Sequence, residues 1–215
     1  MRKAELFILI AVIVSFIIGI YLYSQMPEQM ASHWNAQGQV DDYMPRFWGV
    51  FLMPLVLVGL TLLFIIIPRI DPLKKNIEKF RKYYDGFIIL FFIFMLLVYV
   101  QTILWNLGIE ISPNLVFPIL MGLLFFYIGI LLENAKRNWF IGIRTPWTLS
   151  SEKVWNKTHK LGSKMFKIAG IIALIGFLFQ KYTFYFILVP VLFVALYLVV
   201  YSYAQKCLRK PHTLV

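Results

Sequence analysis

Long apolar runs alternate with shorter polar segments along the whole chain. The apolar runs cover residues 6–23, 47–67, 86–107, 115–132, 166–179 and 184–203, and the fifth is the shortest. A helix needs about 20 largely apolar residues to cross the roughly 30 Å hydrocarbon core of a bilayer. The pattern therefore predicts an all-α membrane protein with six transmembrane helices. Arg2 and Lys3 precede the first run, but no small-residue cleavage site follows it, so we expect a retained helix rather than a signal peptide.

The composition agrees with this fold class. Of the 215 residues, 60% are hydrophobic and only 14% are charged, which is too few charges for the surface of a soluble domain of this size. The net charge of +11 then predicts contact with a lipid bilayer, including anionic lipids, rather than direct contact with nucleic acid. Cys207 is the single cysteine, so an intramolecular disulfide is excluded.

Basic residues are concentrated in alternate connections. Segment 68–85 holds Arg69, Lys74, Lys75, Lys79, Arg81 and Lys82; segment 133–165 holds Lys136, Arg137, Arg144, Lys153, Lys157, Lys160 and Lys164; the ends of the chain hold Arg2, Lys3, Lys206, Arg209 and Lys210. The other three connections hold two basic residues in all, Arg46 and Lys181. The positive-inside rule therefore predicts a multi-pass protein of the cell (plasma) membrane with both termini in the cytoplasm.

The connection of residues 24–46 is expected outside the cell, and its "HWNAQGQ" predicts an extended piece followed by a turn. It can be a loop held by interfacial anchors such as Trp34 and Tyr43, or a recognition surface. A metal site at His33, Asp41 and Asp42 is not favoured, because the three lack a recognised ligand spacing.

The connection of residues 133–165 is expected in the cytoplasm. Gly142 and Pro146 indicate irregular backbone, and Ser150 or Ser151 is a suitable N-cap for a following helix. Apolar and lysine side chains then alternate as in a short amphipathic helix lying between the fourth and fifth spans. Because Arg144 lies in an apolar and aromatic neighbourhood, we expect it to have a fixed partner.

The segment "RNWFIGIRTPWTLSSEKVWNKTHKLG" resembles the signature of the SdpI family of bacterial and archaeal membrane proteins. The resemblance is carried by Asn138, Gly142, Arg144, Thr145, Pro146, Trp147, Thr148, Trp155, Thr158, His159 and Gly162. Upstream, "MPEQMASHWNAQGQVDDY" resembles the outer-loop motif of the uncharacterised N-terminal domain that precedes this module in the family. We accordingly divide the chain into an N-terminal membrane module, residues 1–110, and an SdpI-like module, residues 111–215, with three helices each.

The resemblance implies an immunity and signalling protein. Such a protein binds a membrane-active peptide toxin or amphiphile from outside and can hold a cytoplasmic regulatory protein at the membrane. The candidate outer motif is His33, Trp34, Asn35 and Gly38, and the candidate cytoplasmic motif is Asn138, Gly142, Arg144, Thr145, Pro146, Trp147, Trp155 and His159.

Two other classes of function were weighed. An enzyme is not expected, because His33 and His159 are predicted on opposite sides of the membrane and Ser150 and Ser151 lack a nucleophile-elbow sequence. No cofactor or metal is expected either. A small-molecule transporter or passive channel without ion coupling stays open as the alternative, with Gln101 as the main polar residue within a span.

The predicted topology can be tested by reporter fusions or by cysteine labelling. A cysteine at position 35 should react with a membrane-impermeant reagent added outside intact cells, because the loop of residues 24–46 is predicted outside. Labelling of position 35 only from the inside would overturn the orientation.

Overall fold

The computed structural model describes residues 2–208; Arg209 and Lys210, two of the basic residues counted above, lie outside this range. The elements are the helices α1 (Lys3–Leu22), α2 (Arg46–Ile70), α3 (Lys74–Lys79), α4 (Arg81–Asn106), α5 (Pro113–Asn134), α6 (Pro146–Ser150), α7 (Glu152–Ile175) and α8 (Thr183–Cys207), the strands β1 (Gln29–Trp34) and β2 (Val40–Pro45), and short 3-10 turns at Tyr23–Gln25, Gly176–Leu178 and Gln180–Tyr182. Within residues 2–208, six helices are long and apolar enough to cross a membrane, which confirms the predicted fold class.

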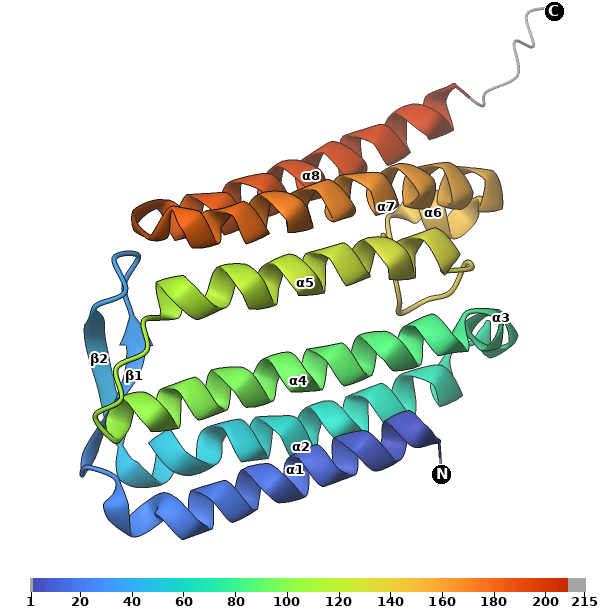
Figure 1. Ribbon diagram of the computed structural model, residues 1–215. Helices are drawn as coiled ribbons and strands as arrows, with labels where there is room; N and C mark the ends of the chain where they lie inside the picture. The colour runs from blue at the N-terminus through green and yellow to red at the C-terminus, as the bar shows by residue number, and fades with distance from the viewer. Residues whose placement is uncertain (1, 209–215) are drawn as a thin grey trace, which may run out of the picture.

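The long helices lie in two groups of three (Figure 1). Helices α1, α2 and α4 contact one another, and α5, α7 and α8 form the second group, with α4 and α5 in contact between them. Helix α1 begins and α8 ends at the same end of the molecule, where α3 and α6 also lie (Figure 1). We call this the basic end; the opposite end, which carries β1 and β2, is the hairpin end.

Two details differ from the sequence predictions. The amphipathic stretch after Ser151 is not a separate helix but the first turns of α7, which continues without a break into the fifth span. The separate short helix is instead α6, in the stretch where irregular backbone was expected. Pro146 permits this because it occupies the first helical turn, where its missing N–H has no intrahelical partner to lose. The predicted N-cap is confirmed, since the Ser151 side chain accepts a hydrogen bond from the Val154 N–H.

Helices α5 and α7 pack closely because glycines line their contact. A Cβ atom added to Gly170 of α7 would lie 2.6 Å from both the Gly122 carbonyl oxygen and the Phe126 nitrogen of α5. About two turns further along α5, a Cβ added to Gly129 would lie 2.7 Å from the Ser163 carbonyl oxygen of α7. Since lipid and protein side chains are equally apolar, such close backbone approach is a main source of stability between membrane helices.

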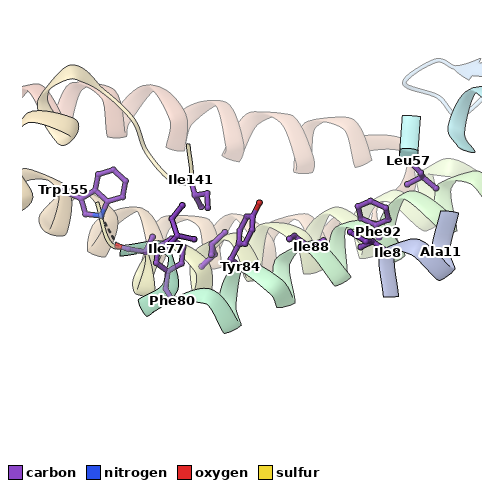
Figure 2. Close-up of a cluster of buried hydrophobic side chains, with 12 residues drawn as sticks. Ile8, Ala11, Leu57, Ile77, Phe80, Tyr84, Ile88, Phe92, Ile141 and Trp155 are labelled. Carbon is purple, nitrogen blue, oxygen red and sulfur yellow. Dashed lines mark hydrogen bonds between the residues drawn. The ribbon is translucent and has the colours of Figure 1, made fainter. Parts of the chain in front are cut away.

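A cluster of buried apolar side chains connects the two groups near the basic end (Figure 2). Tyr84 and Phe80 of α4 and Ile77 of α3 belong to the same cluster as Ile141 and Trp155 from the second half of the chain. The cluster therefore fixes the segment between α5 and α6 against the first helical group.

The glycine contact predicts the effect of adding one methyl group. Gly170→Ala should lower the free energy of unfolding by about 1–3 kcal/mol, because the new Cβ meets backbone atoms that cannot rotate away. The control is Gly59→Ala in α2, where a Cβ would meet nothing within 4 Å and alanine is the better helix former. Thermal unfolding of both variants in detergent measures the difference, and equal melting temperatures would contradict the close-packing account.

Candidate functional site

Asn138 organises the segment of residues 135–145, which we call the motif loop. Its side chain is fully buried, and its amide Nδ2 donates to the carbonyls of Lys136 and Ile141 at 2.8 and 2.9 Å. Its Oδ1 accepts from the N–H groups of Phe140 and Ile141 at 2.9 and 2.6 Å. An asparagine side chain has two donors and two acceptor sites, so all of its hydrogen-bonding capacity is used inside the protein.

His159 and Trp155 of α7 hold the next part of the loop. The His159 Nε2 accepts a 3.0 Å hydrogen bond from the Ile143 N–H, and the Nδ1 lies 2.9 Å from the Trp155 carbonyl oxygen. This arrangement requires a neutral imidazole whose proton is on Nδ1. The two rings stack with centroids 3.9 Å apart, and the Trp155 Nε1 donates to the Ala135 carbonyl, the bond drawn in Figure 2. Gly142 has a φ of +115°, and a Cβ there would overlap His159, so this position requires glycine.

The Thr145–Pro146–Trp147–Thr148 part of the motif forms the start of α6. Thr145 is the N-cap: its side chain accepts from the Thr148 N–H, and the Thr148 hydroxyl in turn contacts the Thr145 N–H. The Thr145 hydroxyl also bonds Ser202 of α8 at 3.1 Å, and the Trp147 ring packs edge-on against Tyr203. The motif thus attaches the loop to α8 as well as to α7.

Arg144 is exposed, and its Nη1 donates to the Trp139 carbonyl at 3.0 Å. It therefore has a partner within the loop, but the partner is a single carbonyl, and no ion pair joins Arg144 to Glu133 or Glu152. Of the candidate cytoplasmic motif, Asn138, Thr145, Trp155 and His159 are buried. These buried side chains build the loop and are not available to a dissolved partner.

Asp71, which sequence reasoning missed, ties the motif loop to the first helical group. It is 2% exposed; its Oδ1 accepts from the Leu73 N–H at 2.6 Å and its Oδ2 from the Trp139 N–H at 2.9 Å. Close by, the Asn76 Nδ2 donates to the Arg137 carbonyl. The "IDP" sequence at the end of α2 was a usable signal, because an aspartate just after a helix often binds the N–H groups of the following turn.

At the hairpin end, β1 and β2 pair antiparallel, which confirms the extended piece and turn predicted from "HWNAQGQ". The Asn35 Oδ1 accepts from the N–H groups of Gln37 and Gln39, both at 3.0 Å. Gly38 has a φ of +79° and lies against Ser112 and Asn114. Asn35 and Gly38 therefore shape the turn, and His33, Trp34 and Asn35 of the candidate outer motif line a cavity.

Two asparagines that sequence reasoning missed fasten the hairpin to both helical groups. Asn106, at the end of α4, accepts from the Ala31 N–H at 2.8 Å and donates to the Ala31 carbonyl at 3.1 Å, as a neighbouring strand would. Asn114, at the start of α5, donates to the Ala36 carbonyl at 3.1 Å. The hairpin consequently bridges the two groups at one end, as the motif loop does at the other.

Beneath the hairpin lies a cavity of about 480 Å³ between the two groups, within the usual range for ligand sites. Its walls include His33 and Trp34 of β1, Gln101 and Thr102 of α4, Phe117 of α5 and Phe184 of α8. His33 is exposed and its Nδ1 lies 2.5 Å from the Asp41 Oδ1, while the half-buried Trp34 packs edge-on against Trp105.

A second cavity of about 280 Å³ lies between the groups at the basic end, lined by Phe64, Tyr84, Leu131 and the motif loop. His33 and His159 lie at opposite ends of the molecule. Within residues 2–208 no group of three histidine, cysteine or acidic side chains could hold a metal ion. Both cavities offer largely apolar binding space.

The link through Asp71 gives a testable consequence. Asp71→Asn keeps one acceptor oxygen but turns an amide donor toward a backbone N–H, so one buried N–H loses its partner. We expect a loss of about 1–3 kcal/mol in the free energy of unfolding. Glu78→Gln, an exposed acid in α3, is the matched control and should unfold like the unchanged chain. If both variants melt alike, Asp71 does not fasten the loop.

Comparisons with known proteins match two separate segments of the chain. Residues 134–202 match the SdpI/YfhL protein family, and residues 10–58 match a domain of unknown function, DUF1648. The chain is also 29% identical to the Immunity protein SdpI of Bacillus subtilis (strain 168) over 204 residues, 94% of each chain. No solved structure matches it significantly. Asp71, Asn106 and Asn114 lie between the two matched segments. This multi-pass membrane protein is therefore similar to the SdpI/YfhL family over residues 134–202 and to the DUF1648 domain over residues 10–58 ahead of them.

Proposed function

We propose that this protein is a membrane immunity protein, which protects the cell that carries it against a membrane-active peptide or amphiphile. A relative that covers 94% of the chain is named an immunity protein. The observation that carries the proposal is the 480 Å³ cavity roofed by a hairpin that is fastened to both helical groups. An agent entering there would touch both halves of the protein at once.

We further propose that the hairpin end faces the outside. The connections at the basic end carry most of the lysine and arginine residues, and such connections are usually retained in the cytoplasm. With this orientation, His33 and Trp34 lie on the side from which a secreted agent arrives.

The basic end is the proposed contact for a cytoplasmic regulatory protein. The buried motif side chains hold the loop in shape, and the exposed Arg144 and Trp139, with the exposed lysines of α7, form the accessible surface. A positive surface attracts an acidic protein, and anionic lipid headgroups compete for the same charges.

A second candidate function is a passive pathway for small molecules. It is favoured by the two cavities that lie at opposite ends of the contact between the same two groups. Release of a small dye from vesicles containing the purified protein would support it, and dye retention equal to that of protein-free vesicles would count against it.

Protection of sensitive cells tests the immunity proposal. Cells expressing the full chain are challenged with membrane-active peptides, and survival is measured against cells without it. Trp34→Ala should lower the tolerated peptide concentration about tenfold, since tryptophans in a binding site often dominate binding. Phe193→Ala, an exposed aromatic residue of α8 that lines neither cavity, is the matched control and should protect like the unchanged chain. The proposal fails if the unchanged chain never protects while it is present in the membrane.

A further inference from the structure

The chemistry of the cavity beneath the hairpin specifies what it can hold. Gln101 is 4% exposed; its Nε2 donates to the Ile111 carbonyl at 3.0 Å, and its Oε1 has no partner among residues 2–208. The Thr102 hydroxyl donates to the Val98 carbonyl of its own helix. Apart from His33 at the rim, no lining residue is ionisable. A charged group inside would have no counter-ion, which is costly, so the part of a ligand that enters must be uncharged.

The cavity has room for more than one apolar side chain. A neighbouring cavity of about 290 Å³, between α2, α4 and the hairpin, shares Ser32, Met53 and Thr102 with it. We call these two cavities the lobes: the larger is walled by Phe117 and Ile187 among others, and the smaller by residues of α2 and α4. A peptide lying along Ser32 would present apolar side chains to both lobes.

The surface around the cavity has the opposite charge from the rest of the protein. In the connections and turns of the hairpin end, residues 23–46, 107–112 and 176–182, the charged side chains are four exposed carboxylates, Glu28, Asp41, Asp42 and Glu110, and two cations, Arg46 and Lys181. Asp41 bonds His33, which lines the cavity, so the negative charge reaches its mouth. Arg46 lies over the Tyr23 ring and bonds the Pro27 carbonyl. In a protein of net charge +11, the described connections of the hairpin end thus carry more acidic than basic side chains, and Asp41 brings one of the carboxylates to the cavity.

We infer that the cavity binds a cationic amphipathic peptide, with uncharged apolar side chains in the two lobes and positive side chains outside at Asp41, Asp42 and Glu110. This inference rests on the proposed function, and it adds the sign of the ligand's charge and the place where the ligand binds.

Binding to the full chain in phosphatidylcholine nanodiscs tests the inference. The probe is a dye-labelled synthetic peptide of leucine, tryptophan and lysine, compared with a version in which glutamate replaces every lysine. Fluorescence anisotropy should show binding of the lysine peptide above that to empty nanodiscs, and about two- to fivefold weaker binding for D42N/E110Q. Glu78→Gln at the basic end is the charge control and should bind like the unchanged chain. Equal affinity for the glutamate peptide would overturn the inferred charge.

The place of binding is tested by filling the cavity. Val98→Trp should weaken binding about five- to hundredfold, because the added ring occupies the larger lobe. Ile187→Trp fills the same lobe from the second group and should act alike if Val98→Trp does not fold. Val189→Trp, exposed on α8, is the control. Unchanged affinity in both filled variants would overturn the site.

Failure of this inference is distinguishable from failure of the proposed function. If cells are protected but the peptide binds the filled variants with unchanged affinity, the proposed site is wrong and the immunity proposal stands. If the peptide binds in the cavity but no cell is protected, the site stands and immunity is wrong.

Discussion

Every backbone polar group near a membrane needs a partner, and lipid supplies none in the hydrocarbon region. Helices meet this requirement by themselves, whereas the motif loop and the unpaired edge and turn of the hairpin need other partners. In this protein, side-chain amides and one carboxylate supply hydrogen-bond partners to these backbone groups: Asn138 and Asp71 at the basic end, and Asn106 and Asn114 at the hairpin end. These few bonds decide how the two helical groups are held together, and therefore where the space between them remains.

The same requirement explains why the candidate cytoplasmic motif contains so many specific residue types. Gly142 provides the left-handed backbone beside His159, and Thr145 caps α6 while reaching α8. A motif composed largely of buried, mutually bonded residues preserves a shape. The exposed remainder, including Arg144, is what a partner can touch. The motif therefore positions the exposed surface at this end, to which Arg144 contributes.

Hydropathy and charge predicted the six spans, because both properties are averages over long continuous segments of the sequence. The Ser151 cap and the turn at Asn35 and Gly38 were also readable, because capping and turns are local. The joins were not. Asp71 meets Trp139, and Asn106 meets Ala31, across long intervals of sequence, and no periodic pattern records such pairs. The cavity depends on these contacts, so its position could not be derived from the sequence, although His33 and Trp34 of the candidate outer motif line it.

The central claim is that a ligand enters between the two helical groups beneath the hairpin. Photocrosslinking measures this most directly: a leucine- and lysine-rich peptide carrying a photoreactive phenylalanine is bound to the full chain in nanodiscs, irradiated, and the attachment sites are identified by mass spectrometry. The account predicts adducts at Met53, Phe117 and Phe184, which line the cavity from three different helices. Adducts confined to the lipid-facing surface of α8, at Val189, Leu196 or Val200, would contradict it.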